Sequence, residues 1–201
     1  MKRVLGLDLD NTIICYDHVF WQVAQETGLL TEDRDSLSKA EVKSALHSEG
    51  RHEEWTRLQG RVYGPEIMRA TLFPGLLGFW NSAQEQGWTV CIVSHKTAKP
   101  ALGPPHDLHA AARGWLEHHG LWNDKVFFEP TEEAKIARLR ALECQIFVDD
   151  LPKVLLNEQF PASVEKWLFD SQKRHDGHAQ KHHWRSFEDW NMAQRWLEER
   201  S

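Results

Sequence analysis

The sequence has few cysteines and none of the spacings that disulfide-rich or zinc-binding domains use. Three occur, Cys15, Cys91 and Cys144, and no Cys-x-x-Cys pair is present. An odd and widely spaced set does not make a disulfide framework, whereas free thiols are typical of a reducing compartment. We therefore expect free thiols and a cytoplasmic protein.

Long hydrophobic segments are also missing. No stretch approaches the roughly 18 apolar residues that a membrane-spanning helix needs. The opening residues Met1, Lys2 and Arg3 lead into an apolar run that soon reaches aspartate, which is too short for the core of a signal peptide. We expect no membrane segment.

Positive charge is not in excess either. The 201 residues include 24 Lys and Arg against 30 Asp and Glu, a formal net charge of −6. Proteins that bind nucleic acid usually carry a basic stripe, so this balance argues against a nucleic-acid partner. The length suits one core domain with a small insertion.

Five short apolar runs are present. Each has the length of a strand and is rich in Val, Ile, Leu, Phe or Trp. Their hydrophobicity is nearly continuous rather than alternating, which is typical of parallel strands that are covered on both faces. The runs are residues 3–9, 88–94, 125–129, 145–149 and 166–170.

Helical patterns separate these runs. They cover residues 75–86, 107–119, 131–142 and 186–197. Thr131 is the expected N-cap of the third helix, and Ser186 with Asp189 resembles a capping box for the last one. Alternating strands and helices predict an α/β fold, with a Rossmann-like doubly wound parallel sheet.

Residues 15–73 break this alternation. They contain no strand-like run, and their pattern is charged and helical. Ser38 with Glu41 predicts a capped helix there, and further helical segments follow from Arg51 and from Gly64. We therefore predict an α/β core, residues 1–14 and 74–201, with a small helical cap, residues 15–73, inserted after the first strand.

Acidic and polar side chains end several of the predicted strands. Asp8 and Asp10 end the first strand, Ser94 the second, and Asp149 with Asp150 the fourth. The carboxyl ends of parallel strands share one edge of a sheet, where ligands bind. Neighbouring carboxylates repel one another unless a cation or a shared proton intervenes, and Mg²⁺ prefers carboxylate oxygens, water and phosphate. This pattern predicts a magnesium site suited to phosphate chemistry.

The ordered set of motifs resembles the haloacid dehalogenase superfamily. Residues 8–12 (DLDNT) match its first motif, 92–94 (IVS) its second, Lys135 its third and 147–150 (FVDD) its fourth. The helical insertion lies where this family places a C1-type cap. The resemblance implies a Rossmann-like core, one Mg²⁺ ion and an aspartyl-phosphate intermediate.

The resemblance also implies a role for each motif residue. Asp8 would be the nucleophile, and Asp10 would protonate the leaving oxygen and then activate water. Ser94 and Lys135 would hold the phosphoryl oxygens. Because dehalogenases of this superfamily lack the acid/base aspartate, Asp10 favours phosphate over halide chemistry.

The same resemblance implies a set of metal ligands. The residues are Asp8, Asp10 through its backbone carbonyl, Asp149 and Asp150. Which of the last two contacts the metal directly stays open, with a slight preference for Asp150.

Other side chains are candidates for substrate contact, although ordinary solvated positions are the alternative. They come from the first motif, the loop after the second strand, the helical insertion and the loop after the fifth strand: Asn11, Thr12, His95, Lys96, Arg57, Arg61, Arg174 and His175. The histidines from His175 to His183 could suggest zinc, but they have no cysteine partners, and substrate contact is the better hypothesis.

Taken together, the motifs predict a Mg²⁺-dependent phosphohydrolase of a small phosphorylated metabolite, such as a sugar phosphate, nucleotide or acid phosphate. A phosphotransferase or mutase with the same nucleophile is the near alternative, and a binding module without turnover is the other. A phosphatase of nucleic-acid ends would need a basic groove. The substrate and the oligomeric state stay open.

Overall fold

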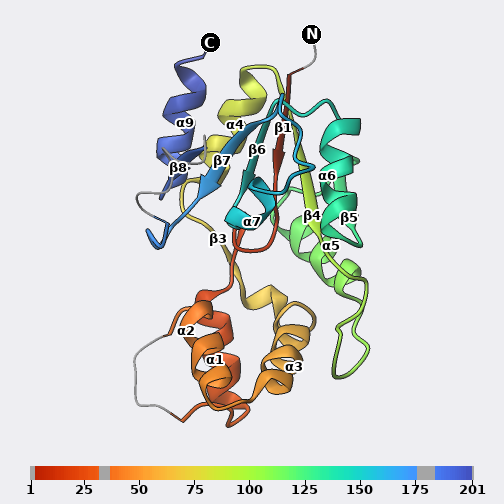
Figure 1. Ribbon diagram of the computed structural model, residues 1–201, viewed down its shortest axis with the longest axis vertical. Coiled ribbons are helices and arrows are strands. Elements are labelled where there is room, and N and C mark those ends of the chain that lie inside the picture. The colour runs from red at the N-terminus through yellow and green to blue at the C-terminus, as the bar shows by residue number, and fades with distance from the viewer. Residues whose placement is uncertain (1–2, 32–36, 176–183, 201) are drawn as a thin grey trace. The chain divides into compact units, whose positions relative to one another are not determined.

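The computed structural model describes residues 3–31, 37–175 and 184–200. The chain forms two compact units (Figure 1). The sheet unit comprises Met1–Ile14, Leu72–His95 and Asp124–Ser201. The helical unit comprises Cys15–Thr71 and Lys96–Asn123.

The sheet unit contains six parallel strands in the order β5-β4-β1-β6-β7-β8. Numbered along the chain within this sheet, this order is the 3-2-1-4-5-6 arrangement of a Rossmann-like fold, so the predicted fold class is confirmed. The strands are β1 (Arg3–Leu7), β4 (Trp88–His95), β5 (Val126–Glu129), β6 (Ile146–Asp149), β7 (Glu165–Phe169) and β8 (Arg185–Phe187).

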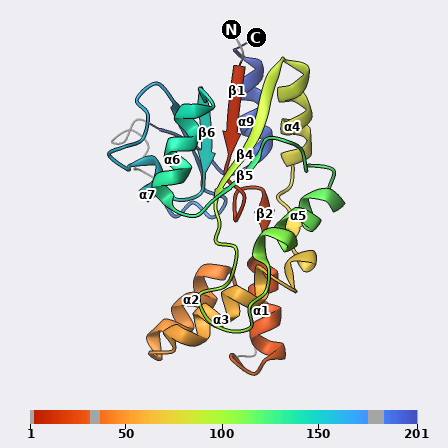
Figure 2. The same cartoon turned by 90° about the vertical axis from the view of Figure 1, so that its right-hand side faces the viewer.

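Helices cover both faces of this sheet (Figure 2). Helices α4 (Leu76–Glu85) and α9 (Trp190–Glu198) pack against each other on one face. Helices α6 (Glu132–Ala141) and α7 (Pro152–Leu155) cover the other. Two-sided cover explains why the strands are apolar throughout, since a strand buried on both faces has no solvent side.

Aromatic side chains fill the layer between the sheet and the α4–α9 pair. The Trp190 ring lies 4.8 Å from that of Phe79 and 5.3 Å from that of Phe169, measured between centroids. Trp190 and Phe79 are fully buried. Rings of this size bury much apolar surface, so this cluster stabilises the attachment of the C-terminal helix.

The helical unit is built around a second aromatic cluster. The rings of Phe20 and Trp55 stack at 5.1 Å, and Tyr63 lies 5.7 Å from Phe20. The Trp115 indole donates a hydrogen bond of 3.0 Å to the carbonyl of Ala70. The elements of the unit are α1 (Asp17–Glu26), α2 (Lys39–Ser48), α3 (His52–Val62), the short 3-10 helix η1 (Ile67–Arg69) and α5 (Leu108–His118).

The helix caps confirm two predictions and correct a third. Ser38 and Glu41 form the predicted capping box of α2, and Thr131 caps α6. The capping box predicted at Ser186 is wrong, because Asp189 caps α9 and accepts from the backbone of Met192 at 3.0 Å. Ser186 lies instead in β8, a three-residue strand that the sequence pattern did not reveal.

The predicted insertion differs in detail. Short strands β2 (Ile14–Cys15) and β3 (Thr71–Leu72) pair at its two ends, where no strand was expected. The helix expected from Gly64 is only the 3-10 turn η1. The boundaries of a cap at residues 15–73 stay a prediction, and the compact helical unit also includes residues 96–123. In the described part of the chain, every helix is too short or too polar to cross a membrane.

Candidate active site

The order of the strands brings two acidic segments together. In a 3-2-1-4-5-6 sheet, ligands bind where the strand order reverses, beyond the carboxyl ends of the central strands. Here β1 and β6 are these neighbours, with Leu7 paired with Val148. The backbone of Asp8 continues the pairing, as its N–H donates to the carbonyl of Val148 at 2.9 Å. Asp8 and Asp149 therefore meet at the reversal point.

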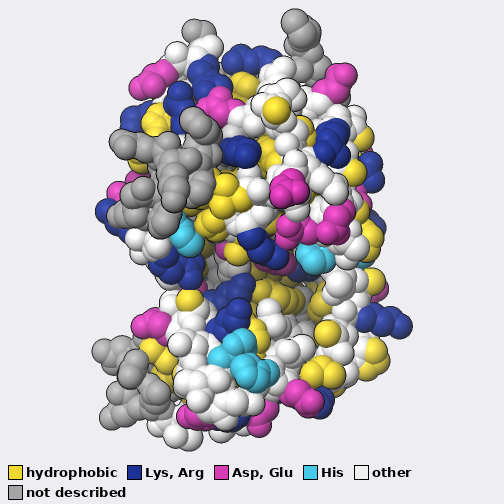
Figure 3. Space-filling model, viewed as in Figure 1, with side chains coloured by type: hydrophobic (Ala, Val, Ile, Leu, Met, Phe, Trp, Pro, Cys, Tyr) yellow, Lys and Arg dark blue, Asp and Glu magenta, His cyan; other side chains and the backbone are white. Residues whose placement is uncertain are grey.

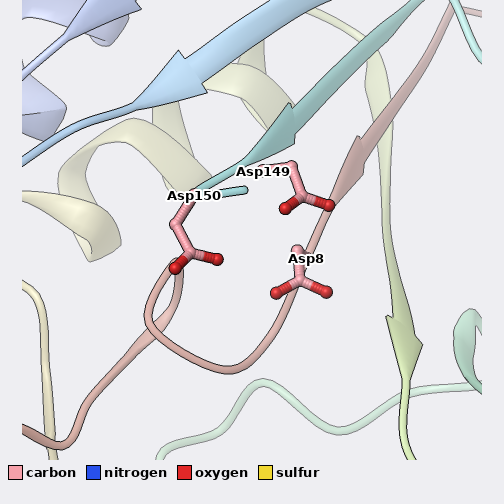
Figure 4. Close-up of side chains that lie close together, drawn as sticks. All are labelled: Asp8, Asp149 and Asp150. Carbon is pink, nitrogen blue, oxygen red and sulfur yellow. The ribbon is translucent and has the colours of Figure 1, made fainter. Parts of the chain in front are cut away.

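Three carboxylates gather there. Asp8, Asp149 and Asp150 each offer an oxygen, and these oxygens lie within 4.8 Å of one another. Figure 4 shows the three side chains directed towards one shared space. Asp8 is 5% exposed and Asp149 is fully buried. Charges of one sign this close and this buried repel one another unless a nearby cation or a bound proton offsets them.

Lys135 supplies one cation. Its Nζ donates to Oδ1 of Asp8 and to Oδ2 of Asp149, each at 2.6 Å. The side chain starts from the first half of α6, whose N-terminus is fixed by the Thr131 cap, and it is buried. Short, charge-assisted bonds of this kind hold both carboxylates in place.

The charges shift the pKa values of the buried groups. Burial alone would lower the pKa of Lys135, but the carboxylates of Asp149 and Asp8 outweigh it, and the net shift is upward. Burial raises the pKa of Asp149 to about 6, and the charge of Asp8 adds to this, while Lys135 opposes it. Lys135 is therefore protonated at neutral pH, and Asp149 is a weaker acid than usual.

The two oxygens of Asp149 are both engaged by protein groups. Oδ2 accepts from Lys135, and Oδ1 accepts from the backbone N–H of Leu151 at 2.9 Å. On Asp8, Lys135 bonds only Oδ1. Asp8, Asp149 and Asp150 could together hold a metal ion. A set of carboxylate oxygens is of the kind that suits Mg²⁺, which takes one or two carboxylates and completes its shell with water and phosphate.

The residues of the first motif form a tight turn after β1. The carbonyl of Leu9 accepts from the N–H groups of Ile13 and Ile14, at 2.9 and 3.0 Å. Asn11 sits in the turn with a positive φ of 62°, and Asp10 forms a bridge to Ile14. The turn places Asp10 and Asn11 next to the carboxylate cluster along the chain. Thr12 is fully buried, and its hydroxyl has no hydrogen-bond partner among the described residues.

Ser94 and His95 end β4, the strand on the other side of β1. Leu7 pairs with Ile92, so Ser94 lies at the same edge of the sheet as Asp8. The Ser94 side chain is 1% exposed, whereas His95 is exposed. The structure thus brings Ser94 to the edge that carries the carboxylates.

Asp170, which the sequence reasoning missed, organises the loop after β7. Its Oδ1 accepts from the N–H of Arg174 at 3.0 Å, and its Oδ2 accepts from the N–H of His175 at 2.7 Å. Asp170 is 5% exposed, while Arg174 is exposed. Its signal was available, because it ends a predicted strand just as Asp149 does. The other histidines of this loop lie outside the described residues.

The remaining predicted contacts belong to the helical unit. Lys96 is buried, with its Nζ 5.0 Å from the centroid of the Tyr63 ring. Arg57 and Arg61 line a cavity formed by residues of the helical unit. The structure therefore joins Asp8, Lys135 and Asp149 directly, and places Arg57, Arg61 and Lys96 in the other unit.

Comparisons with known proteins give matches in structure alone. No protein-family model matches the chain, and no curated protein sequence matches it. A predicted phosphatase from Clostridium acetobutylicum superposes with a TM-score of 0.64 at 11% identity, over 99% of each chain. A HAD-superfamily hydrolase from Ehrlichia chaffeensis gives 0.57 at 18% identity, over 99% of this chain and 98% of that one.

A third solved structure contains a metal. The HAD-hydrolase YfnB from Bacillus subtilis, bound to magnesium, superposes with a TM-score of 0.59 at 13% identity, over 98% of each chain. At these identities the likeness shows the fold. The fold that the sequence motifs implied is thus confirmed over nearly the whole chain.

Proposed function

We propose that this chain, which has the fold of the haloacid dehalogenase superfamily hydrolases, is a magnesium-dependent phosphohydrolase of small phosphorylated metabolites. One observation carries the proposal. Lys135 joins Asp8 and Asp149 beside Asp150, at the point of the sheet where ligands bind. The predicted phosphatase and the magnesium-bound hydrolase among the solved structures support it.

The metal would be held by Asp8 and Asp150, together with the backbone carbonyl of Asp10. Asp149 would position Lys135 and the strand end, since both of its oxygens accept protein hydrogen bonds. A bound Mg²⁺ ion supplies positive charge that screens the phosphoryl oxygens from the acidic cluster.

Asp8 is the proposed nucleophile. One of its carboxylate oxygens forms a bond to phosphorus while the bond from phosphorus to the leaving oxygen breaks. Asp10 donates the proton that the leaving oxygen takes up. In the second half, Asp10 removes a proton from water, which attacks phosphorus and releases phosphate and free Asp8.

Lys135 and Ser94 assist this transfer in the proposal. Lys135 holds the Asp8 carboxylate in place and offsets negative charge as it spreads over the phosphoryl oxygens. Ser94 donates a hydrogen bond to one of these oxygens. Asn11, Thr12, His95, Lys96, Arg174 and His175 stay predictions for substrate contact, and the cytoplasm stays the predicted location.

The test is phosphate release from a panel of sugar phosphates, nucleotides and organic acid phosphates. We expect release with Mg²⁺, none with EDTA, and a loss of at least about a thousandfold in Asp8→Asn. Asp124→Asn is the control, because its side chain is 82% exposed and forms a surface ion pair with Lys125.

The outcomes separate the candidate functions. Unchanged turnover in a folded Asp8→Asn variant would remove Asp8 as nucleophile and sink the proposal. Consumption of the phosphate donor that rises only when an acceptor sugar is added, with a phosphorylated sugar formed in place of free phosphate, would identify a phosphotransferase. Asp10→Asn should form the phosphorylated Asp8 slowly and hydrolyse it more slowly still, which mass spectrometry of the trapped protein can follow.

A further inference from the structure

The helical unit contains a cavity of about 460 Å³ that shares no residue with the carboxylate cluster. This volume lies within the roughly 300–1,000 Å³ range of small-molecule sites. Four of its nine lining residues are apolar, and the other five carry polar or charged groups. The lining residues are Thr27, Leu29, Arg57, Leu58, Arg61, Pro65, Glu66, Pro104 and His106.

Gly60 in α3 and Gly64 just after it lack side chains, so a loop can pack against them and close one wall of the cavity. A side chain at Gly60 would place its Cβ 2.6 Å from Cβ of Pro100, and one at Gly64 would come within 3.1 Å of Cβ of His106. Such distances exclude any larger residue unless the loop moves. The loop that carries Pro104 and His106 is thus packed directly on α3.

The segment after α1, which also lines the cavity, is held to α3 as well. Arg51 donates from Nη1 to the carbonyl of Leu29 at 2.9 Å, which ties the segment after α1 to the start of α3. The cavity is therefore bounded by three segments with fixed contacts. A preformed site of this kind loses little conformational entropy when a ligand binds.

The charged lining residues are two arginines and Glu66, an excess of one positive charge. Arg57 and Arg61 lie one helical turn apart on α3, so both guanidinium groups reach the same side. Arg57 contacts Glu53 at 3.5 Å, and Arg61 contacts Glu66 at 3.1 Å. Among the described residues, each guanidinium uses one of its five N–H donors in these bonds. Donors thus remain for an acidic ligand.

The apolar lining continues beyond this cavity. Pro65 and His106 also line a neighbouring hollow of about 380 Å³, whose floor includes Ile67 and Ala110. Figure 3 shows hydrophobic side chains at the surface over α3 and the adjoining loop, with charged side chains next to them. A ligand suited to these surfaces has an apolar body and one acidic group.

We propose that this cavity is a second ligand site, which binds an organic anion with an apolar body, its acid group held by Arg57 and Arg61. The assignment replaces the prediction that these two arginines contact the phosphorylated substrate. It does not depend on the phosphohydrolase function, since none of its residues belongs to that site.

The probe for the test is anilinonaphthalene sulfonate, an aromatic anion whose fluorescence rises on binding, and its uncharged parent N-phenylnaphthylamine. We expect the full-length protein to bind the anion at one saturable site and to prefer it to the parent. Arg57→Gln and Arg61→Gln should each weaken binding of the anion about fivefold to tenfold, with little effect on the parent. Added salt should reduce the preference, because the arginines are partly exposed.

Arg113→Gln is the matched control. Arg113 lies in the same unit on α5, pairs with Glu117 at i,i+4 and is 58% exposed, close to the 54% of Arg57. It does not line the cavity, so binding should not change. Leu29→Trp, which fills the cavity, should abolish binding while circular dichroism stays native.

Either of two results overturns the proposal. The first is equal binding of the anion by the wild type and by a folded Arg57→Gln, Arg61→Gln double variant. The second is an equal loss in the Arg113→Gln control. Asp8→Asn should retain probe binding. Probe binding therefore tests this site alone, and phosphate release tests the phosphohydrolase function alone.

Discussion

The ammonium group of Lys135 lies between two buried carboxylates, at 2.6 Å from each. Removing this cation leaves Asp8 and Asp149 facing each other without compensation, and breaking a buried ion pair from one side costs about 3–5 kcal/mol. We predict that Lys135→Met loses at least about a hundredfold in phosphate release and unfolds at lower urea concentration. Urea unfolding followed by tryptophan fluorescence measures the second effect.

A double variant separates stability from catalysis at this site. Asp149→Asn combined with Lys135→Met removes one charge of each sign, so most of the lost stability should return while turnover stays low. If the double variant were no more stable than Lys135→Met alone, repulsion between the carboxylates would not be the cause of the stability lost in Lys135→Met.

If the cluster binds Mg²⁺ as proposed, the raised pKa of Asp149 should couple this binding to pH. Its pKa is about 6 in the folded protein, above the ordinary value, so without metal this group destabilises the fold as pH rises through that value. Mg²⁺ favours the ionised form of the cluster and should stabilise the protein most above pH 6. We predict that the rise in Tm caused by Mg²⁺ is large near pH ~7.5 and small near pH ~5.

Differential scanning fluorimetry at the two pH values measures this effect. NaCl at the same ionic strength serves as a control for general salt effects. An equal shift of Tm by Mg²⁺ at both pH values would contradict a role for Asp149 ionisation in metal binding.

At the scale of elements, the contact between β1 and β6 decides the geometry of the site. Gly6 on β1 faces Phe147 on β6, and a Cβ at this position would lie 2.9 Å from the Phe147 ring and 3.1 Å from Sγ of Cys144. The Phe147 ring in turn lies 5.3 Å from Nζ of Lys135. Close packing by a glycine therefore supports the lysine that bridges the carboxylates.

We predict that Gly6→Ala destabilises the protein by about 1–3 kcal/mol, because it overpacks a full core, and that it lowers turnover by shifting Lys135. Gly78→Ala on α4 is the control. Its Cβ would meet only the flexible end of Gln194 at 3.2 Å, and alanine favours helix over glycine by about 1 kcal/mol. Urea unfolding of both variants measures their stability. An equal change in the free energy of unfolding in Gly6→Ala and Gly78→Ala would contradict the packing argument.

The helix caps show which local features can be predicted from the sequence. The caps at Ser38 and Thr131 depend on hydrogen bonds within one turn, so residue type and spacing identify them. The cap at Asp189 was assigned to Ser186 because both residues suit that role. Only the pairing of β8 with β7, which places Ser186 opposite Leu168, shows that Ser186 belongs to a strand.

At the scale of the whole molecule, burial decides how the three thiols react. Cys91 and Cys144 are buried in the core of the sheet unit, whereas Cys15 is partly exposed. Burial raises the pKa of Cys144 to about 12, and the thiolate is the reactive form. We predict that a thiol reagent labels Cys15 first and labels Cys91 and Cys144 only as the sheet unit unfolds.

The measurement is the rate of labelling in native buffer and in guanidinium chloride, with Cys15→Ser as the control. That variant should show no fast-reacting thiol in native buffer. Fast labelling of all three thiols in the native protein would contradict the packing of the sheet unit.

The sequence alone determined the five main strands, most helices and the acidic residues at the strand ends. These features are local, since strand length, helical period and residue type at a strand end can all be read within a few neighbours. It also pointed to Lys135 through the motif it shares with the haloacid dehalogenase superfamily. The tertiary structure alone decided that Lys135 bonds both Asp8 and Asp149, because these residues are 127 and 14 positions away from it.

The same reason applies to β8 and the cavity beside Arg57. Both depend on segments that are distant in the sequence and meet only when the sheet is ordered and the loop packs on Gly60. Local patterns predict which segments become strands and helices, but the free energy of contacts between distant segments decides which side chains meet.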